Sequence, residues 1–155
     1  MHNLKHTASG LAYDVVDAVP PWQGQRAPVV FHHGIGTNHH VWADWLPAVA
    51  TAHTCIRFDT RGYGQSPVPT PQHTFTLDNC LADLMEVVDA AGSDRVHLVG
   101  ESFGGTVALL AAIRHPARVA TVTISNAAYK GLGIQYVAGW REGFASKGVP
   151  RGAPT

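Results

Sequence analysis

The sequence has little of what marks a membrane, secreted or nucleic-acid-binding protein. Its 155 residues include only two cysteines, Cys55 and Cys80, and 11 basic residues balance 11 acidic ones. A net charge of zero gives no electrostatic attraction to nucleic acid or to an anionic membrane. No apolar stretch approaches the roughly 18 residues that span a bilayer, and the N-terminal residues lack the apolar core of a signal peptide. We therefore expect a cytoplasmic protein with no nucleic-acid or membrane partner.

Disulfide and metal chemistry also have little support. The two cysteines, one on an expected strand and one on an expected helix, have no special spacing, so we expect buried free thiols. Histidine is abundant, with ten residues, but none stands in an H-E-x-x-H or C-x-x-C setting. The adjacent pairs His32–His33 and His39–His40 point in different directions on a strand or helix. We predict no metal and no cofactor.

What the sequence does have is a regular alternation of apolar strands with amphipathic helices. Hydrophobic residues make up 45% of the chain and charged residues 14%, which is typical of a globular domain. Continuous runs of Val, Ile and Leu separated by helices predict an α/β fold, in which a mostly parallel sheet has helices on both faces. The expected elements are a hairpin of residues 3–7 and 11–16, strands 29–33, 54–58, 95–99 and 118–124, and helices 39–50, 77–91 and 103–114. We expect Thr76 to be the N-cap of the second helix.

The most informative segment is an apolar strand that runs directly into Gly-x-Ser-x-Gly. Residues 96–99 are Val-His-Leu-Val, then come Gly100, Ser102 and Gly104, and a helix-forming run continues to Arg114. A serine on such a sharp strand-to-helix turn holds its hydroxyl clear of the sheet, and the flanking glycines avoid collisions with the neighbouring strand and helix. We interpret the segment as a nucleophile elbow and Ser102 as a catalytic nucleophile.

Two other glycine-containing loops follow expected strands. One begins at His33-Gly34-Ile35, after the strand that starts at Ala27, and the other runs from Asp59 to Ser66. All three loops then lie at the carboxyl ends of parallel strands, where such sheets bind ligands. Unobstructed backbone N–H groups at these ends suit an oxyanion hole. We predict the backbone N–H groups of Ile35 and Phe103 as its donors.

These motifs together resemble the N-terminal part of the α/β-hydrolase family, over roughly residues 5–133. His32-His33-Gly34-Ile35-Gly36 and residues 124–128 are most similar to the 3-oxoadipate enol-lactonase and esterase branch. The matching positions are His33, Gly34 and Ile35 in the H-G-x loop, Asp59, Arg61, Gly62, Gly64 and Ser66 in the D-x-R-G-x-G-x-S loop, and Gly100, Ser102 and Gly104 in the elbow.

The resemblance implies a serine hydrolase that cleaves a small carboxylic ester or enol-lactone through an acyl-enzyme. It also implies that Asp59 and Arg61 fix their loop rather than act on substrate. Residues 1–155 would then form one incomplete domain with about six of the family's eight strands. Residues 134–155, including Tyr136 and Trp140, would start a cap or form a frayed tail.

The family's catalytic acid and histidine follow the serine in chain order, and the sequence supplies neither. The one histidine after Ser102 is His115, about three helical turns away, or roughly 20 Å along the axis. The one later carboxylate is Glu142, far beyond the strand at 118–124. We therefore expect the chain alone to be inactive or very weakly active, because loss of a triad histidine can reduce the rate by about 10⁶. We also expect the edge of strand 118–124 to favour self-association or pairing with a missing C-terminal half.

Several interpretations stay open. The chain is alternatively an inactive fragment or a hydrolase-like binding scaffold, or it belongs to a cofactor-free haloperoxidase or a C–C bond hydrolase. The serine argues against dehalogenase or epoxide-hydrolase chemistry, because the resemblance implies an aspartate at the elbow of those enzymes. We expect Trp42 and Trp45 to pack in the core, and Glu101 to lie near the pocket mouth, where it would influence specificity.

Overall fold

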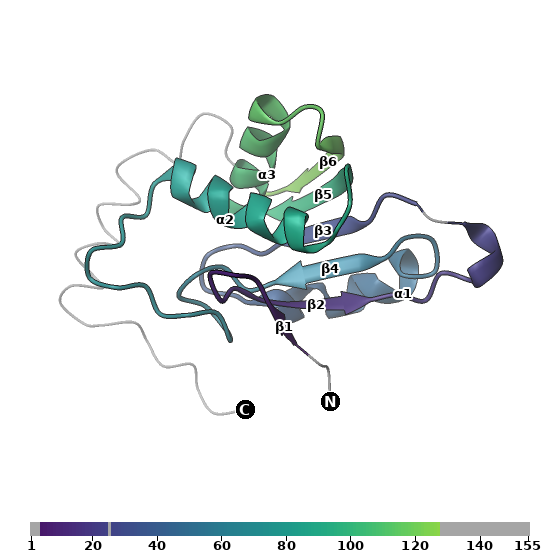
Figure 1. Ribbon diagram of the computed structural model, residues 1–155, viewed down its shortest axis with the longest axis horizontal. Coiled ribbons are helices and arrows are strands. Elements are labelled where there is room, and N and C mark those ends of the chain that lie inside the picture. Colours follow the sequence, from purple (N-terminus) through teal and green to yellow (C-terminus); the bar gives the residue numbers. More distant parts are fainter. Residues whose placement is uncertain (1–3, 25, 128–155) are drawn as a thin grey trace.

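The structure, a computed structural model, describes residues 4–24 and 26–127. Within these ranges six strands form one sheet in the order β1-β2-β4-β3-β5-β6 (Figure 1). Strands β4, β3, β5 and β6 run parallel, and β1 and β2 form an antiparallel hairpin whose second strand pairs with β4. The strands are β1 (Lys5–His6), β2 (Ala12–Val16), β3 (Val29–His32), β4 (Cys55–Phe58), β5 (Val96–Glu101) and β6 (Val119–Ser125). The predicted α/β fold with a mostly parallel sheet is confirmed.

Two long helices follow the expected boundaries closely. They are α2 (Leu77–Ala90) and α3 (Phe103–Arg114). Thr76 caps α2 as predicted, because its hydroxyl accepts a hydrogen bond from the backbone N–H of Asn79 at 3.1 Å.

Within the described residues no helix combines the length and apolarity that a membrane crossing requires. The expectations for residues 134–155, including Tyr136 and Trp140, lie outside the described residues.

The single helix expected over residues 39–50 is wrong. The segment is a 3-10 helix, η2 (His39–Trp45), followed by one short α-helical turn, α1 (Leu46–Val49). Another 3-10 turn, η1 (Pro21–Gln23), lies earlier in the chain. Pro47 explains the break, because proline has no N–H to donate to the carbonyl four residues before it. Leu46 instead donates its N–H to Ala43 O, three residues back, in the tighter 3-10 pattern.

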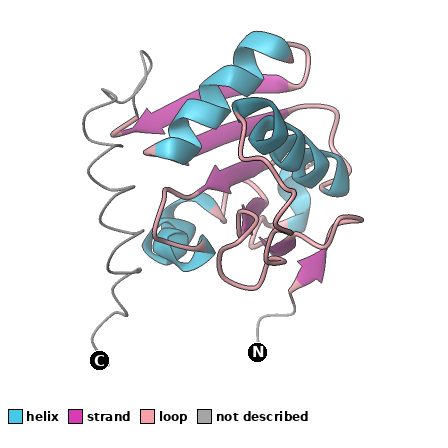
Figure 2. Ribbon diagram, turned by 90° about the vertical axis from the view of Figure 1, so that its left-hand side faces the viewer, coloured by secondary structure: helices cyan, strands magenta, loops and turns pink. Residues whose placement is uncertain are grey.

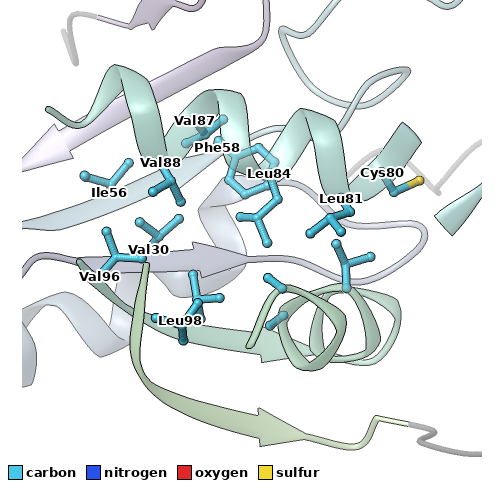
Figure 3. Packing of buried hydrophobic residues seen from close by; sticks show 14 of the residues in the cluster. Val30, Ile56, Phe58, Cys80, Leu81, Leu84, Val87, Val88, Val96 and Leu98 are labelled. Carbon is cyan, nitrogen blue, oxygen red and sulfur yellow. The ribbon is translucent and has the colours of Figure 1, made fainter. Parts of the chain in front are cut away.

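The larger part of the core lies between the sheet and the α2–α3 pair (Figure 3). Because successive strand residues point to opposite faces, alternate positions of β3, β4 and β5 meet these helices. The labelled core residues from the strands are Val30, Ile56, Phe58, Val96 and Leu98, and those from α2 are Cys80, Leu81, Leu84, Val87 and Val88. This packing fixes where the carboxyl ends of β3 and β5 lie relative to α2 and α3.

A smaller cluster covers the opposite face of the sheet, so helical segments flank it on both sides (Figure 2). Trp42 of η2 packs there on Phe31, with ring centroids 5.1 Å apart, and is 3% exposed. The prediction that Trp45 belongs to the core is wrong, since its side chain is 46% exposed. Residues three apart in a 3-10 helix lie on the same face of the helix. Trp45, however, is the last residue of η2, and its ring meets that of Trp42 edge-on instead of reaching the sheet.

A buried ion pair lies on this same face of the sheet. Arg57 of β4 and Asp14 of β2 are opposite one another in the antiparallel register. The guanidinium donates from Nε to Asp14 Oδ1 at 3.0 Å and from Nη2 to Asp14 Oδ2, and both side chains are almost fully buried. Each charge is therefore neutralised by the other within the sheet.

Both cysteines are free and buried, as predicted. Burial raises the pKa of Cys55 to about 11, and burial together with nearby Asp83 raises the pKa of Cys80. Such thiols are poor nucleophiles because the thiolate is the reactive form.

At the far side of the sheet, β6 pairs with β5 and with no other strand of the described residues. The expected self-association through β6 stays a prediction.

Candidate active site

Ser102 occupies a strained turn between β5 and α3. Its backbone has φ 53° and ψ −120°, a conformation that side-chain-bearing residues rarely adopt. Its N–H donates to Ser125 O of β6 at 2.9 Å, and its carbonyl accepts from Thr106 N of α3 at 3.2 Å. Strand pairing and the first helical turn thus hold the serine in this conformation from both sides.

Close backbone approaches around the serine explain the glycines beside it. A Cβ on Gly104 would lie 2.2 Å from His32 O, and a Cβ on Gly100 would lie 2.5 Å from Gly104 O. A Cβ on Gly34 would lie 3.0 Å from the Cβ of Ser102. The three glycines therefore let α3, β5 and the loop after β3 meet at the serine.

The two predicted oxyanion donors lie beside one cavity. Ile35 and Phe103 both line a cavity of about 310 Å³, as does Gly34. Phe103 begins α3, and N–H groups in the first turn of a helix have no acceptor within the helix. The positive end of the helix dipole also points toward this position. The arrangement brings a serine, a helix N-terminus and the loop after β3 together at one edge of the sheet.

His33 is held by hydrogen bonds on both ring nitrogens. Its Nε2 accepts from the backbone N–H of Thr60 at 3.0 Å, so its Nδ1 carries the proton and donates to Gly34 O at 2.8 Å. Burial lowers the pKa of His33, only partly offset by the Gly34 carbonyl and by Asp59. A neutral ring with both nitrogens engaged joins the loop after β3 to the loop after β4 and is not free to act as a base.

His32 lies directly under the elbow and is fully buried. Its Nδ1 lies 3.0 Å from His33 O, and its ring meets Phe58 edge-on, with centroids 4.8 Å apart. Its Nε2 has no hydrogen-bond partner among the described residues. Burial lowers the pKa of His32 to about 3, with the His33 carbonyl opposing this and the charge of His33 adding to it. Protonation would place a positive charge in the core.

This histidine predicts loss of stability in acid. The unfolded chain binds a proton at His32 below about pH 6.5, whereas the folded chain resists it down to about pH 3. The stabilisation is therefore complete above pH 6.5 and is lost as the pH falls toward 3. We expect the free energy of unfolding in urea to drop by about 3 kcal/mol between pH 6.5 and 4 through this group.

The His32→Leu variant should lose much less over the same pH interval, because it has no group to protonate at this position. His6→Gln, a change at an exposed residue of β1, is the matched control and should follow the unsubstituted chain. An equal acid loss in the His32→Leu variant would assign the effect to other groups.

Asp59 organises the loop after β4. One carboxylate oxygen accepts from the backbone N–H and the ring Nδ1 of His39, each at 2.8 Å, and the other accepts from Gln65 N at 2.8 Å. Burial alone would raise the pKa of Asp59, but these hydrogen bonds outweigh it and hold that pKa below its usual range. A Cβ on Gly64 would lie 2.0 Å from the carboxylate. Asp59 thus joins η2 to the loop after β4, and the structural role expected for it stays a prediction.

Arg61 forms a two-point ion pair with Asp83 of α2. Its Nε and Nη2 donate to the two carboxylate oxygens at 3.1 and 2.8 Å, and Nη2 also donates to Ser9 Oγ at 2.9 Å. The carboxylate of Asp83 raises the pKa of Arg61, against the effect of burial. The pair ties the loop after β4 to α2. Sequence reasoning named Arg61 but missed its partner, because the two residues are 22 positions apart and no local pattern links them.

The other titratable residues considered from the sequence lie elsewhere. His115 directly follows α3, a 12-residue helix that Ser102 directly precedes, and at 1.5 Å per residue the two are about 20 Å apart. Glu101 is half-buried, and its Oε2 would lie 2.1 Å from a Cβ on Gly34. Within residues 4–24 and 26–127, no group of three metal-ligating side chains gathers.

Comparison with known proteins agrees with this geometry. A family model for the alpha/beta hydrolase fold matches residues 27–153. The chain is 35% identical over 107 residues to 3-oxoadipate enol-lactonase 1 of Acinetobacter baylyi, covering 68% of this chain and 39% of that protein. It is 36% identical over 107 residues to 2-hydroxy-6-oxo-2,4-heptadienoate hydrolase of Pseudomonas putida, covering 67% and 38%.

A solved structure of an enol-lactonase has a fold similar to that of this chain. The enol-lactonase from Burkholderia xenovorans superimposes with a TM-score of 0.82 at 22% identity, over 94% of this chain and 55% of that one. The chain spans about two fifths of the length of the curated relatives it matches. The family match covers more than half of the chain and includes the elbow, the loop after β3 and the loop after β4. The chain therefore belongs to the α/β-hydrolase fold family.

Proposed function

We propose that the chain carries the nucleophile and oxyanion hole of a serine hydrolase that cleaves carboxylic esters or lactones through an acyl-enzyme. The observation that carries this proposal is the backbone of Ser102, at φ 53° and ψ −120° between β5 and α3. A strained conformation that neighbouring elements maintain at a cavity edge is typical of a functional site. The similarity to an enol-lactonase supports the ester and lactone substrate class.

In the proposed reaction, Ser102 Oγ attacks the substrate carbonyl as its proton passes to a base. The carbonyl oxygen becomes an anion that the N–H groups of Ile35 and Phe103 stabilise, and collapse expels the alkoxide, which takes up a proton. Water then attacks the acyl-enzyme, releasing the acid and restoring the serine. Stabilisation by preorganised N–H donors can contribute about 10²–10³ in rate per donor.

We propose that the base and its orienting acid are not supplied by residues 4–24 and 26–127. His33 has both nitrogens engaged, His32 is buried without access to the cavity, and His115 stands at the far end of α3. These described residues then hold the nucleophile without the group that activates it. Its own turnover should be very slow, since the oxyanion hole and binding alone leave about 10³–10⁴ over water.

A second candidate is C–C bond hydrolysis with the same nucleophile. The chain is 36% identical to the Pseudomonas putida hydrolase and 35% identical to the Acinetobacter baylyi enol-lactonase. These similarities support C–C bond hydrolysis and lactone hydrolysis about equally. Both candidates require an activated serine beside an oxyanion hole. They differ in the group that leaves, which is an oxygen in one and a carbon in the other.

Labelling with a fluorophosphonate, followed by intact-mass measurement, tests the nucleophile. We expect a slow adduct of one probe per chain that Ser102→Ala abolishes, because the elbow exposes the serine while its base is missing. Ser93→Ala, at a loop serine that is half-buried like Ser102, is the matched control and should label like the unsubstituted chain. Labelling that survives Ser102→Ala would overturn the nucleophile assignment, and labelling complete within seconds would overturn the absence of a base.

A further inference from the structure

The cavity beside the elbow is lined by apolar side chains that are exposed to solvent within the described residues. Its volume of about 310 Å³ lies at the small end of ligand pockets, which run from about 300 to 1,000 Å³. Ile35, Phe75 and Leu77 line it, and all three are among the exposed large hydrophobic side chains of the described residues. Phe103 and Tyr63 complete the apolar surface. Apolar side chains gathered around a concave site indicate a binding surface.

The charges in the cavity wall cancel one another. Arg61 and Asp83 are its two charged lining residues, and they form the two-point pair at 2.8 and 3.1 Å described above. The side chains of both are at most 15% exposed. The guanidinium is thus already matched by a carboxylate and by Ser9. A further carboxylate, Glu101, packs against Gly34 of the same wall. Apart from the backbone N–H groups of Ile35 and Phe103, which the proposed function reserves for the reacting carbonyl oxygen, a bound anion therefore finds no free cationic side chain among the lining residues.

We propose that this cavity selects an uncharged, apolar acyl or alcohol group, a short alkyl chain or a single aromatic ring, and rejects a group that carries a carboxylate. The inference rests on the proposed function, because it names the substrate class of that same site. Its physical basis is the desolvation of an anion: an ionised carboxylate without a partner in an apolar site is strongly disfavoured. Asp83 is the residue that sets this selectivity, since it occupies the one guanidinium in the wall.

Binding of two matched probes tests the selectivity without any turnover. 4-Nitrophenylacetamide and 4-carboxyphenylacetamide have the same shape and carry the same amide for the oxyanion donors, but only the second has a charge on the ring at pH 7. NMR titration of the 155-residue chain gives both dissociation constants. We expect 4-nitrophenylacetamide to bind at least tenfold more tightly, with shifts at Leu77 and Phe103. Asp83→Asn frees the charge of Arg61 and should reduce or invert this ratio. Asp89→Asn, which breaks an exposed pair with Arg118, is the matched control and should leave it unchanged.

A second variant guards against misfolding of Asp83→Asn. Leu77→Lys adds an ammonium group at an exposed position of the rim and should also shift the preference toward 4-carboxyphenylacetamide. Equal binding of the two probes, tighter binding of 4-carboxyphenylacetamide, or no binding of either overturns the inference. Failure of Ser102-dependent labelling, measured separately, overturns the proposed function and leaves the probe ratio as an independent result.

Discussion

Replacing Asp14 with alanine is expected to lower the free energy of unfolding by about 3–5 kcal/mol. The substitution leaves the guanidinium of Arg57 buried within the sheet without its two hydrogen-bond acceptors. A buried charge that loses its partner keeps its full desolvation penalty. Urea denaturation at pH 7 would measure the loss as a lower midpoint with an unchanged slope.

An exposed ion pair provides the matched control for this variant. Asp89 pairs with Arg118 at 2.8 Å, but the two side chains are 64% and 34% exposed. Asp89→Ala should therefore change stability by less than about 1 kcal/mol. The double variant Asp14→Leu with Arg57→Met should lose less than Asp14→Ala, because it removes both charges and keeps the volume filled. Equal losses for the buried and exposed pairs would contradict this account.

Replacing Gly100 with alanine is expected to disrupt both the fold and the elbow. The added Cβ would lie 2.5–2.6 Å from backbone atoms of Gly104 and Gly105, well below contact distance. Because these atoms belong to the first turn of α3 and not to a flexible side chain, relief requires the helix to move away from β5. We expect a loss of about 3 kcal/mol or more, together with loss of Ser102 labelling. Thermal melts and the mass-based assay measure the two effects.

Gly92→Ala separates steric collision from backbone conformation. Gly92 has φ +68° and nothing within 4 Å of an added Cβ, so alanine there meets conformational strain without a clash. That strain is worth about 1–2 kcal/mol. Gly100 has no positive φ, and its penalty comes from contact alone. If the two variants lost the same stability, close packing of α3 on β5 would not be what requires glycine at position 100.

The sequence was sufficient for features that depend on neighbours along the chain. Apolar runs of four to six residues predicted the strands, helical spacing and the Thr76 cap predicted α2, and glycine spacing located the elbow at Ser102. Such patterns arise from side-chain periodicity and local turn chemistry, so no distant contact is needed to read them. The wrong prediction over residues 39–50 also has a local cause, because Pro47 interrupts the helical hydrogen bonds within that segment.

The tertiary structure decided everything that depends on a distant partner. The sequence shows that His33 follows a strand, but it does not show that Thr60, 27 residues later, occupies its second nitrogen and removes it as a base. In the same way, Arg61 is visible as part of a motif, whereas its neutralisation by Asp83 depends on how α2 packs. The reason is physical: hydrogen bonds and ion pairs between separate elements require those elements to be docked. The sequence by itself determined the fold class and the position of the strained turn at Ser102, and packing determined which charged and basic groups have their hydrogen-bonding atoms already engaged.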